Sequence, residues 1–406
     1  MREDIKEIYS SAIKEVLPKN LIQKNEYLQS FTNKNTYLFG SGKASISMAV
    51  EIEKLFGDKI IDGVVVSPYK DESLKRVRVI ESSHPIPSYK SLEAGKILYD
   101  KLSSLEKDDF FIYMLSGGSS ALIELLHPLI SLKDLEITTT LLLQNAVPIE
   151  EINTVRKHLS LIKGGQLGAC TKACGVVLVI SDVIGDDLEA IGSAPLFFDS
   201  STILDAKEVL LKYELFERVP ENVKELFDRF LNETPKKPNE NIEHIIIGSN
   251  KIALKEARCK ALSLGYSCDI VTDSLQGDVK LVAKKIVEAI LQSNSDVLLF
   301  GGECTVKVIG SGKGGRNQEL ALRVLELIKN HTNITFLSAG SDGIDGNSKA
   351  AGGIVDSKSY REDLPAFLEN SDSYHYLKRG NDLLVTDESG TNVMDIMIAL
   401  KGDTNV

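Results

Sequence analysis

The fold of this chain is decided by one stretch, Asp296-Val297-Leu298-Leu299-Phe300-Gly301-Gly302-Glu303, in which a continuous apolar run ends in two glycines and an acid. Continuous hydrophobicity predicts a strand covered on both faces, as in a parallel sheet with helices on either side. Glycine lets the backbone approach a ligand and adopt a positive φ. Soon afterwards, Gly314-Gly315-Arg316 adds a guanidinium whose fork of donors fits phosphate or carboxylate. The stretch therefore predicts an α/β fold that binds small anionic ligands at strand ends.

The same pattern recurs along the chain. Apolar runs that end in glycine or serine precede helical patterns such as Ser91–Leu105 and Lys251–Leu264. This alternation predicts a doubly wound α/β architecture, in which ligands bind at the carboxyl ends of the strands. The strands are expected at Thr36–Phe39, Gly63–Ser67, Phe110–Leu115, Gly175–Ile180, His244–Ile247, Asp296–Phe300 and Thr335–Ser338.

Length and one polar segment predict two domains. The 406 residues are enough for two hydrophobic cores, and the segment Asn232–Asn241 is polar and contains two prolines. We expect an N-terminal domain over residues 1–235 and a C-terminal domain over residues 242–406. The sequence leaves open which of these domains residues 243–292 join.

Charge and hydropathy exclude several classes of partner. The chain has 47 Lys and Arg against 58 Asp and Glu, a net charge of −11, so it repels nucleic acid and anionic membranes as a whole. No apolar run reaches the roughly 18 residues of a membrane span, and the N-terminus lacks an apolar signal region. The five cysteines have neither disulfide-like nor zinc-like spacing. We therefore expect a cytoplasmic monomer or homodimer that binds anions through local positive sites.

Two glycine-containing turns in the first half are candidate anion sites. Gly40-Ser41-Gly42-Lys43 follows a strand and opens a helix, so backbone N–H groups and Lys43 can meet an anion. It lacks the third glycine of a dinucleotide fingerprint and the Walker A spacing, so a tight turn with a solvated lysine remains an alternative. The second turn, Ser116-Gly117-Gly118-Ser119-Ser120, predicts an anion cradle. A serine nucleophile is disfavoured because the Gly-x-Ser-x-Gly elbow is missing.

The segment Asn153–His158 is expected to open a helix that ends near Lys163-Gly164-Gly165. Arg156 and His158 would point to different helix faces, so one ligand can meet only part of the segment. We take Arg156 as the ligand-binding candidate and expect His158 to be packed and hydrogen-bonded. For Lys157 a solvated basic face remains equally open.

Acidic loops follow two other predicted strands. Asp182 comes directly after a buried strand and is followed by a glycine turn with Asp187, which suits Mg²⁺ because this ion prefers oxygen ligands. Asp182 could instead accept the proton of an attacking hydroxyl, and the spacing does not separate the two roles. The loop Ser338–Gly346 contains Asp342 but lacks the glutamate of a calcium loop. It predicts a second acidic edge of an active cleft.

In this order the motifs closely resemble those of the glycerate 2-kinase family, whose C-terminal domain is called MOFRL. The resemblance runs from about residue 36 to residue 400. It implies a Rossmann-like N-terminal domain and a smaller α/β C-terminal domain, with the active site in the cleft between them. The matching motifs are Phe39–Ala44, His84–Pro87, Ser116–Leu122, Ile152–Gly165, Ser181–Pro195, Gly301–Val306, Gly312–Glu319, Asp342–Gly346 and Gly390–Asp395.

The resemblance implies that ATP phosphorylates the C2 hydroxyl of D-glycerate to give 2-phosphoglycerate, with Mg²⁺ or another divalent cation. The family's lysine and arginine that are thought catalytic correspond to Lys43 and Arg316, and we add Asp182 as a metal ligand or hydroxyl-orienting group. Substrate or phosphate contacts are expected at Gly42, Ser116, Gly117, Gly118, Ser119, Arg156 and Asn317, nucleotide contacts at Gly301, Gly302, Glu303, Gly314 and Gly315, and metal contacts at Asp182, Asp187 and Asp342.

The chain departs from the family pattern most notably in one turn near its C-terminus. Thr386-Asp387-Glu388-Ser389 stands where relatives tend to have Thr-Gly-Pro-Thr, which adds two negative charges and leaves the role of this turn open.

An NAD(P)-dependent hydroxypyruvate reductase is the alternative function, but it needs a complete dinucleotide fingerprint with an acid about 20 residues beyond it. Asp62 precedes its strand and does not fit that position. A phosphosugar-sensing module is disfavoured because a binder of anions does not need two acidic loops.

Overall fold

The chain forms two compact units, which a computed structural model describes over residues 1–402. The N-terminal unit contains Ile22–Ile180 and Asp186–Ile247. The C-terminal unit contains Met1–Leu21, Ser181–Gly185 and Gly248–Val406. Residues 403–406, the last of the second predicted domain, lie outside the described residues. The first 21 residues therefore group with the C-terminal unit and not with the domain predicted over residues 1–235.

The N-terminal unit is built on a six-stranded sheet in the order β3-β2-β1-β4-β5-β6. The chain runs outward from β1 to β3 and then crosses to β4 on the other side of β1, with parallel pairing. The carboxyl ends of β1 and β4 therefore lie side by side at the switch point of a doubly wound sheet. The strands are Thr36–Ser41 (β1), Ile60–Ser67 (β2), Arg78–Glu81 (β3), Phe110–Leu115 (β4), Cys174–Ile180 (β5) and Ile242–Gly248 (β6).

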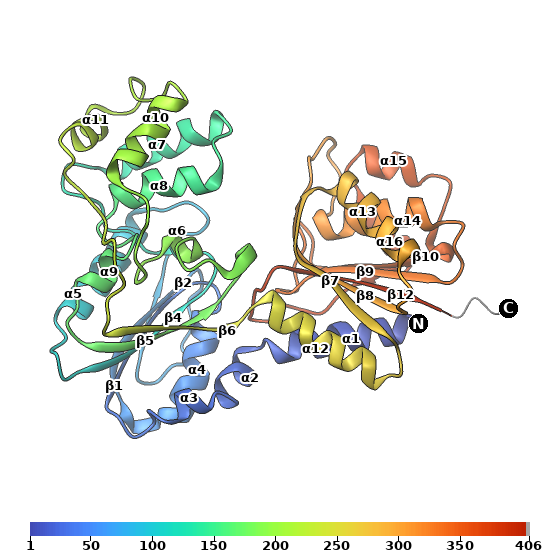
Figure 1. The fold of residues 1–406 in the computed structure, drawn as a ribbon, viewed down its shortest axis with the longest axis horizontal. Helices are drawn as coiled ribbons and strands as arrows, with labels where there is room; N and C mark the ends of the chain where they lie inside the picture. The colour runs from blue at the N-terminus through green and yellow to red at the C-terminus, as the bar shows by residue number, and fades with distance from the viewer. Residues whose placement is uncertain (403–406) are drawn as a thin grey trace. The chain divides into compact units, whose positions relative to one another are not determined.

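Helices cover both faces of this sheet (Figure 1). Helix α4 packs against β1, β2 and β4, and α5 lies on the opposite face. Helices α7, α8, α10 and α11 form a cluster with a hydrophobic core of its own. The bounds are Pro18–Gln23 (α2), Glu26–Gln29 (α3), Ser45–Phe56 (α4), Tyr89–Ser103 (α5), Ser119–Leu122 (α6), Leu132–Gln144 (α7), Ile149–Leu159 (α8), Gln166–Ala169 (α9), Ile203–Lys212 (α10) and Glu221–Asp228 (α11).

The C-terminal unit contains a second six-stranded sheet in the order β11-β10-β9-β12-β8-β7. Strand β12 lies antiparallel between β8 and β9, whereas β7 pairs in parallel with β8. Strand β10 is also antiparallel to its neighbours β9 and β11, so this sheet is mixed. The strands are Cys268–Asp278 (β7), Val297–Thr305 (β8), Ile334–Gly340 (β9), Gly352–Asp356 (β10), Leu383–Leu384 (β11) and Asp395–Lys401 (β12).

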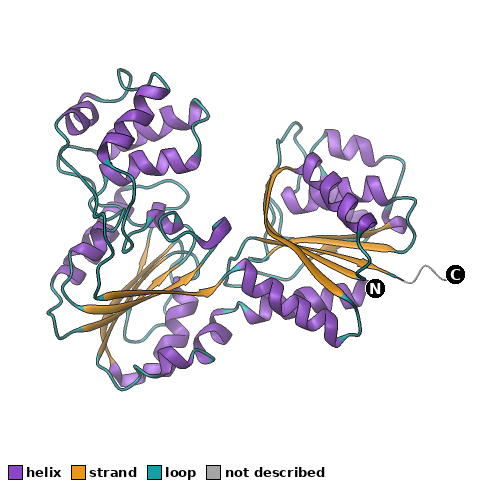
Figure 2. Ribbon diagram, in the orientation of Figure 1, coloured by secondary structure: helices purple, strands orange, loops and turns teal. Residues whose placement is uncertain are grey.

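Helices α1 and α12 pack together on one face of this sheet, and α13 and α14 lie on the other (Figure 2). Two residues of α1 hold it there: Arg2 forms ion pairs with Asp356 and Asp382, and the Tyr9 hydroxyl donates to the Gly340 carbonyl at 2.7 Å. These contacts explain why the N-terminus belongs to this unit. The helices are Arg2–Glu15 (α1), Asn250–Ser263 (α12), Val279–Gln292 (α13), Arg316–Ile328 (α14), Leu364–Glu369 (α15) and Ser373–Arg379 (α16).

The predicted α/β fold is confirmed, and each of the seven predicted strands is present. One predicted helix start is wrong: α8 begins at Ile149, directly after Pro148, and ends at Leu159. Asn153–His158 therefore forms the second half of a helix and not its beginning. Among residues 1–402, no helix is long and apolar enough to cross a membrane.

Candidate active site

The loops after β1 and β4 form one structure in the N-terminal unit. The Lys43 N–H donates to the Gly117 carbonyl at 2.9 Å, and the Ala44 N–H donates to Ser116 Oγ at 3.0 Å. Gly42 has a φ of 131°, and a Cβ there would lie 2.2 Å from Ser116 Oγ, so this position requires glycine. The Lys43 side chain is exposed. The two predicted turns thus meet and present one ammonium group.

His84 lies beside these loops. A Cβ on Gly118 would lie 2.9 Å from His84 Cδ2 and 3.5 Å from Lys43 Cγ, so the imidazole and the lysine stem flank Gly118. Burial and the Lys43 ammonium both lower the pKa of His84. An imidazole with a lowered pKa is neutral near pH 7 and offers one donor and one acceptor. His84 stands in the motif His84–Pro87 but was not among the predicted site residues.

The serines of the second turn bind other protein groups. Ser116 Oγ accepts the Ala44 N–H, as described above. Ser119 Oγ lies 2.6 Å from Ser41 Oγ, which also lies 2.6 Å from the Tyr113 hydroxyl. Both Ser41 and Ser119 are fully buried. Ser119 therefore has a protein partner in Ser41 of β1, and its predicted ligand contact stays a prediction.

Arg156 reaches the second turn from α8. Its Nη2 donates to the Ser120 carbonyl at 3.2 Å, while its buried Nε has no hydrogen-bond partner among the residues described. Burial lowers the pKa of Arg156, and the charge of Glu124 opposes this effect. Glu124 itself is fully buried in an ion pair with Lys163, and burial lowers the pKa of Lys163 to about 8. Buried charges of both signs therefore lie behind the Ser116–Ser120 turn.

Strand β8 continues through Gly301 and Gly302 to Thr305. A Cβ on Gly301 would lie 1.6 Å from Asn250 Oδ1, and one on Gly302 would lie 2.3 Å from the Leu275 carbonyl oxygen. Both glycines are buried and pair with β12. The sequence predicted that the strand ends before them and that they contact a nucleotide. Their position inside the sheet explains the need for glycine by close packing, and the nucleotide contact stays a prediction.

A cavity of about 430 Å³ lies where β8 ends and α14 begins. Gly314 and Gly315 precede the helix, and a Cβ on Gly315 would lie 2.3 Å from Asp345 Oδ1. These two glycines line the cavity, and their predicted nucleotide contacts stay predictions. The lining also includes Glu303, Arg316, Asp345 and Ser373.

Arg316 is held by two carboxylates of different exposure. Its Nε and Nη2 donate to Oδ2 and Oδ1 of Asp395 at 2.6 and 2.9 Å. Its Nη1 lies 2.9 Å from Oε1 of Glu303. Burial by itself would lower the pKa of Arg316, but the contacts with Asp395 raise it overall, so the guanidinium remains charged. Asp395 ends the motif Gly390–Asp395, and no role was predicted for it.

Asp345 caps the N-terminus of α14 by accepting hydrogen bonds from its first backbone N–H groups. Its carboxylate accepts the N–H groups of Asn317 and Gln318 at 3.1 and 2.8 Å, and burial raises its pKa to about 6. The Asn317 side chain is buried and accepts a hydrogen bond from the Ser338 hydroxyl at 2.6 Å. Asn317, a predicted substrate contact, therefore joins α14 to β9 in this structure.

The predicted metal ligands fall into both units. Asp182 and Asp342 belong to the C-terminal unit, and both charges contribute to raising the pKa of Glu303, which burial raises most. Asp187 belongs to the N-terminal unit, where its carboxylate accepts the Glu189 N–H at 2.9 Å. Over residues 1–402, no group of three or more His, Cys, Asp or Glu side chains is placed to hold a metal ion.

The acidic turn at residues 386–389 packs on the Asp342 loop. The Ser389 N–H donates to the Asp342 carbonyl at 3.1 Å, and the Ser389 hydroxyl donates to the Ser341 carbonyl at 2.7 Å. A Cβ on Gly343 would lie 1.9 Å from the Asp387 carbonyl oxygen. The turn that departs from the family therefore supports a loop that carries a candidate metal ligand.

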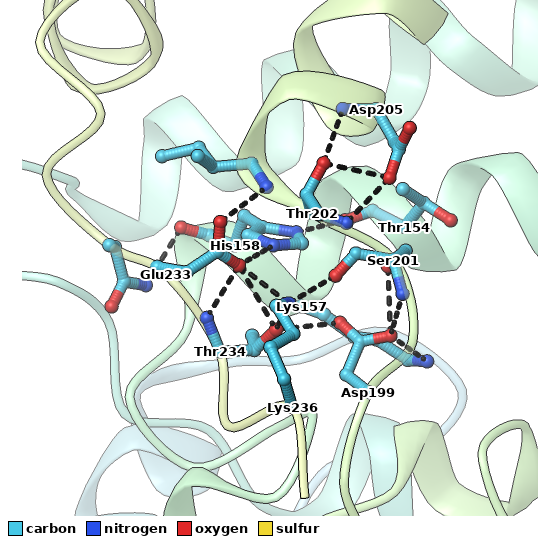
Figure 3. Close-up of polar contacts among 12 residues, drawn as sticks. Thr154, Lys157, His158, Asp199, Ser201, Thr202, Asp205, Glu233, Thr234 and Lys236 are labelled. Carbon is cyan, nitrogen blue, oxygen red and sulfur yellow. Dashed lines mark hydrogen bonds and ion pairs between the residues drawn. The ribbon is translucent and has the colours of Figure 1, made fainter.

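A second buried aspartate holds α8 in the N-terminal unit (Figure 3). Lys157 Nζ donates to Asp199 Oδ1 at 3.0 Å, and Thr234 Oγ1 donates to Asp199 Oδ2 at 3.0 Å. The neighbouring His158 Nε2 lies 3.2 Å from Glu233 Oε1. We call Lys157, His158, Asp199, Glu233 and Thr234 the α8 network. Lys157 is buried in it and does not form the solvated face that the sequence left open.

Two family models match the chain. The model described as a domain of unknown function, DUF4147, matches residues 4–228. The model described as the MOFRL family matches residues 296–395. These matches include the Lys43 loops in the first case and the Arg316 cavity in the second.

Named relatives match almost the whole chain. A glycerate 2-kinase of Pyrococcus horikoshii is 41% identical, over 90% of this chain and 87% of the relative. A D-glycerate 2-kinase of Thermotoga maritima is 37% identical over 97% of both chains. The crystal structure of a glycerate kinase from Thermotoga maritima matches with a TM-score of 0.91 and 36% identity over 98% of both chains. Sequence and structure thus lead to the same group of relatives.

Proposed function

Because the chain belongs to the glycerate 2-kinase family, we propose that it transfers the γ-phosphoryl group of ATP to the C2 hydroxyl of D-glycerate. The C2 oxygen forms a bond to the γ-phosphorus while the bond from that phosphorus to the β–γ bridging oxygen breaks. ADP leaves, and the hydroxyl proton passes to a base. The products are 2-phosphoglycerate and ADP.

The observation that carries this proposal is the Arg316 guanidinium at the wall of a cavity of about 430 Å³. Phosphoryl transfer asks the protein mainly to position its substrates and to stabilise charge on the phosphoryl oxygens. A charged guanidinium with donors left on Nη1 and Nη2 suits that task. The side chain is 34% exposed, so a phosphate can reach it. We assign Arg316 the role of stabilising the transferred group.

The Lys43 loops supply a second positive site. The exposed Lys43 ammonium and the adjacent Gly117 and Gly118 backbone suit an anionic group of the substrate or nucleotide. The unpartnered Arg156 Nε adds a buried donor near the same turn. We assign this group to binding of a carboxylate or phosphate.

A divalent cation fits the acids of the C-terminal unit. Mg²⁺ usually takes one or two protein carboxylates together with substrate phosphates and water, so a cage of three protein ligands is not required. Asp182 and Asp342 would hold the ion, since both charges act on the same neighbour, Glu303. Such an ion would neutralise charge on the phosphate oxygens.

The alternative, an NAD(P)-dependent hydroxypyruvate reductase, has less support. The turn at Gly40–Lys43 lacks the third glycine of the dinucleotide fingerprint. The relatives described above are named as kinases. An absorbance trace at about 340 nm with hydroxypyruvate and each reduced nicotinamide would reveal a reductase by loss of cofactor absorbance.

Phosphorus NMR of the protein with D-glycerate, ATP and Mg²⁺ tests the proposal directly. A 2-phosphoglycerate resonance is expected. A 3-phosphoglycerate resonance would keep the kinase and contradict the assignment of the C2 hydroxyl. Absence of any phosphorylated glycerate from folded protein would contradict the proposed function.

A further inference from the structure

We propose that the two carboxylates on Arg316 act in opposite senses: Asp395 positions the guanidinium for an anion, whereas Glu303 competes with that anion. This inference deepens the proposed function, and it rests on that function for the identity of the anion as a phosphate. It assigns Asp395 as a positioning residue and gives Glu303 a role different from the predicted nucleotide contact.

Asp395 holds one edge of Arg316 from a fixed backbone. Its two oxygens accept Nε and Nη2 at 2.6 and 2.9 Å, and this bidentate contact fixes the plane of the guanidinium. Asp395 is the first residue of β12, pairs with Gly302 and is fully buried. Asn250 Nδ2 donates to its carbonyl at 2.9 Å. Neither the carboxylate nor its backbone is therefore placed to exchange with a ligand.

Glu303 lies at the cavity wall and contacts Nη1, the nitrogen of Arg316 that Asp395 does not hold. Its Oε1 lies 2.9 Å from Nη1, and its side chain is 45% exposed. Burial of its carboxylate and the charges of Asp395, Asp182 and Asp342 raise its pKa, and Arg316 opposes them. An anion that approaches Arg316 from the cavity meets Glu303 at Nη1. Glu303 must then move away or repel it.

The two roles predict opposite effects from the same chemical change. Loss of a negative charge near Arg316 by itself favours any anion, so a purely electrostatic account predicts tighter binding in both Asp395→Asn and Glu303→Gln. Positioning predicts weaker binding in Asp395→Asn, because an amide presents one acceptor and one donor to two N–H groups. A group misplaced by about 1 Å can lose about a hundredfold in rate.

Calorimetric titration of metal-free ADP into the full chain is the test. We expect Asp395→Asn to weaken ADP binding by about tenfold, because the guanidinium is no longer held in one plane. We expect Glu303→Gln to tighten binding by about two- to fivefold, within the range for a partly exposed ion pair. In turnover, Asp395→Asn should lower kcat more than it raises KM for D-glycerate, since D-glycerate need not contact Arg316 to bind.

Asp382→Asn is the matched control. Asp382 is a buried carboxylate of the same unit, and it pairs with Arg2 at 2.8 Å. This variant should lose stability without a change in ADP affinity. Tighter or unchanged binding in Asp395→Asn would overturn the positioning role, as would no detectable ADP binding by the unsubstituted protein. If Asp395→Asn does not fold, Glu303→Gln still decides, because weaker or unchanged binding there overturns the proposal.

The titration separates this inference from the proposed function. Phosphorus NMR on the same preparation reports whether D-glycerate is phosphorylated. An unsubstituted protein that makes no product but shows the opposite ADP affinities would contradict the kinase and support the pair of roles. If the unsubstituted protein makes 2-phosphoglycerate but both variants change ADP affinity in the same direction, the kinase is supported and the pair of roles is contradicted.

Discussion

Two fully buried aspartates each hold a cation in this molecule, Asp395 with Arg316 and Asp199 with Lys157. In the α8 network, Asp199 also accepts hydrogen bonds from Ser201 at 3.1 and 2.8 Å (Figure 3). The side chain of Lys157 is 8% exposed, and that of Arg316 is 34% exposed beside a cavity. A buried ion pair whose cation still has donors open to a ligand thus indicates a candidate site. A buried ion pair whose groups all contact protein indicates a structural role.

The largest expected effect is a loss of turnover when Arg316, the more exposed of the two cations, is replaced. Arg316→Lys should lower turnover by about a thousandfold, because an arginine that stabilises phosphoryl transfer contributes that much and lysine lacks its fork. Lysine keeps a positive charge beside Asp395, so the fold should persist. Release of ADP from ATP and D-glycerate under saturating substrates measures kcat. Turnover within about threefold of the unsubstituted protein would remove Arg316 from the mechanism.

The second prediction concerns the other aspartate. Asp199→Asn should lower the free energy of unfolding by about 3 kcal/mol, because it leaves the buried Lys157 without its ionic partner. Turnover per folded molecule should be retained, since Asp199 faces protein groups. Urea unfolding gives the stability, and the ADP-release assay at low temperature gives the turnover. An inactive but equally stable variant would show that the α8 network belongs to the active site.

The sequence predicted the strands and loops of both regions but not their ion pairs. Strand ends can be predicted because a continuous apolar run followed by glycine is a local pattern, and β8 and β4 appeared where expected. The partner of Arg316 is 79 residues away in the chain and depends on β12 pairing with β8. The partner of Lys157 is 42 residues away. No local pattern specifies such contacts, so Asp395 received no role and Lys157 was placed on a possible solvated face.

Glycine pairs are ambiguous in the sequence for a related reason. A glycine pair after an apolar run predicts both a ligand-binding turn and a close approach of backbone. Gly314 and Gly315 border the cavity, whereas Gly301 lies against Asn250 inside the unit. The side chain that decides between the two explanations comes from α12, which only the folded structure brings to β8.

A third, smaller effect tests how tightly the α8 network is packed. Gly164 has a φ of 58°, and a Cβ there would lie 2.8 Å from Thr234 Cγ2 and 3.2 Å from Asp199 Oδ2. Gly164→Ala should lower the free energy of unfolding by about 1–2 kcal/mol through backbone strain and this contact. Gly265→Ala is the control, because Gly265 has a φ of 90° and an added Cβ would have no other atom of residues 1–402 within 4 Å. Equal losses in urea unfolding would show that strain alone acts.

The smallest expected effect is a dependence of stability on pH in the α8 network. Burial by itself would raise the pKa of Glu233, but hydrogen bonds from Lys236 and from the Ile203 and Thr234 N–H groups lower it from 4.5 to about 2. Because the folded-state pKa is the lower one, the contribution of Glu233 is fully present above about pH 4.5 and is lost as the pH falls towards 2. It should be below about 1 kcal/mol, since the side chain is partly exposed.

Urea unfolding of the unsubstituted protein and of Glu233→Gln, compared from neutral pH downwards, measures this contribution. Glutamine keeps an acceptor but does not titrate, so the difference in stability between the two proteins should shrink as the pH falls below 4.5. High salt should reduce the difference at neutral pH, because the ion pair with Lys236 is exposed to solvent. A difference that is constant with pH would mean that Glu233 acts through packing. It would then be the buried Asp199 alone that ties this network together electrostatically.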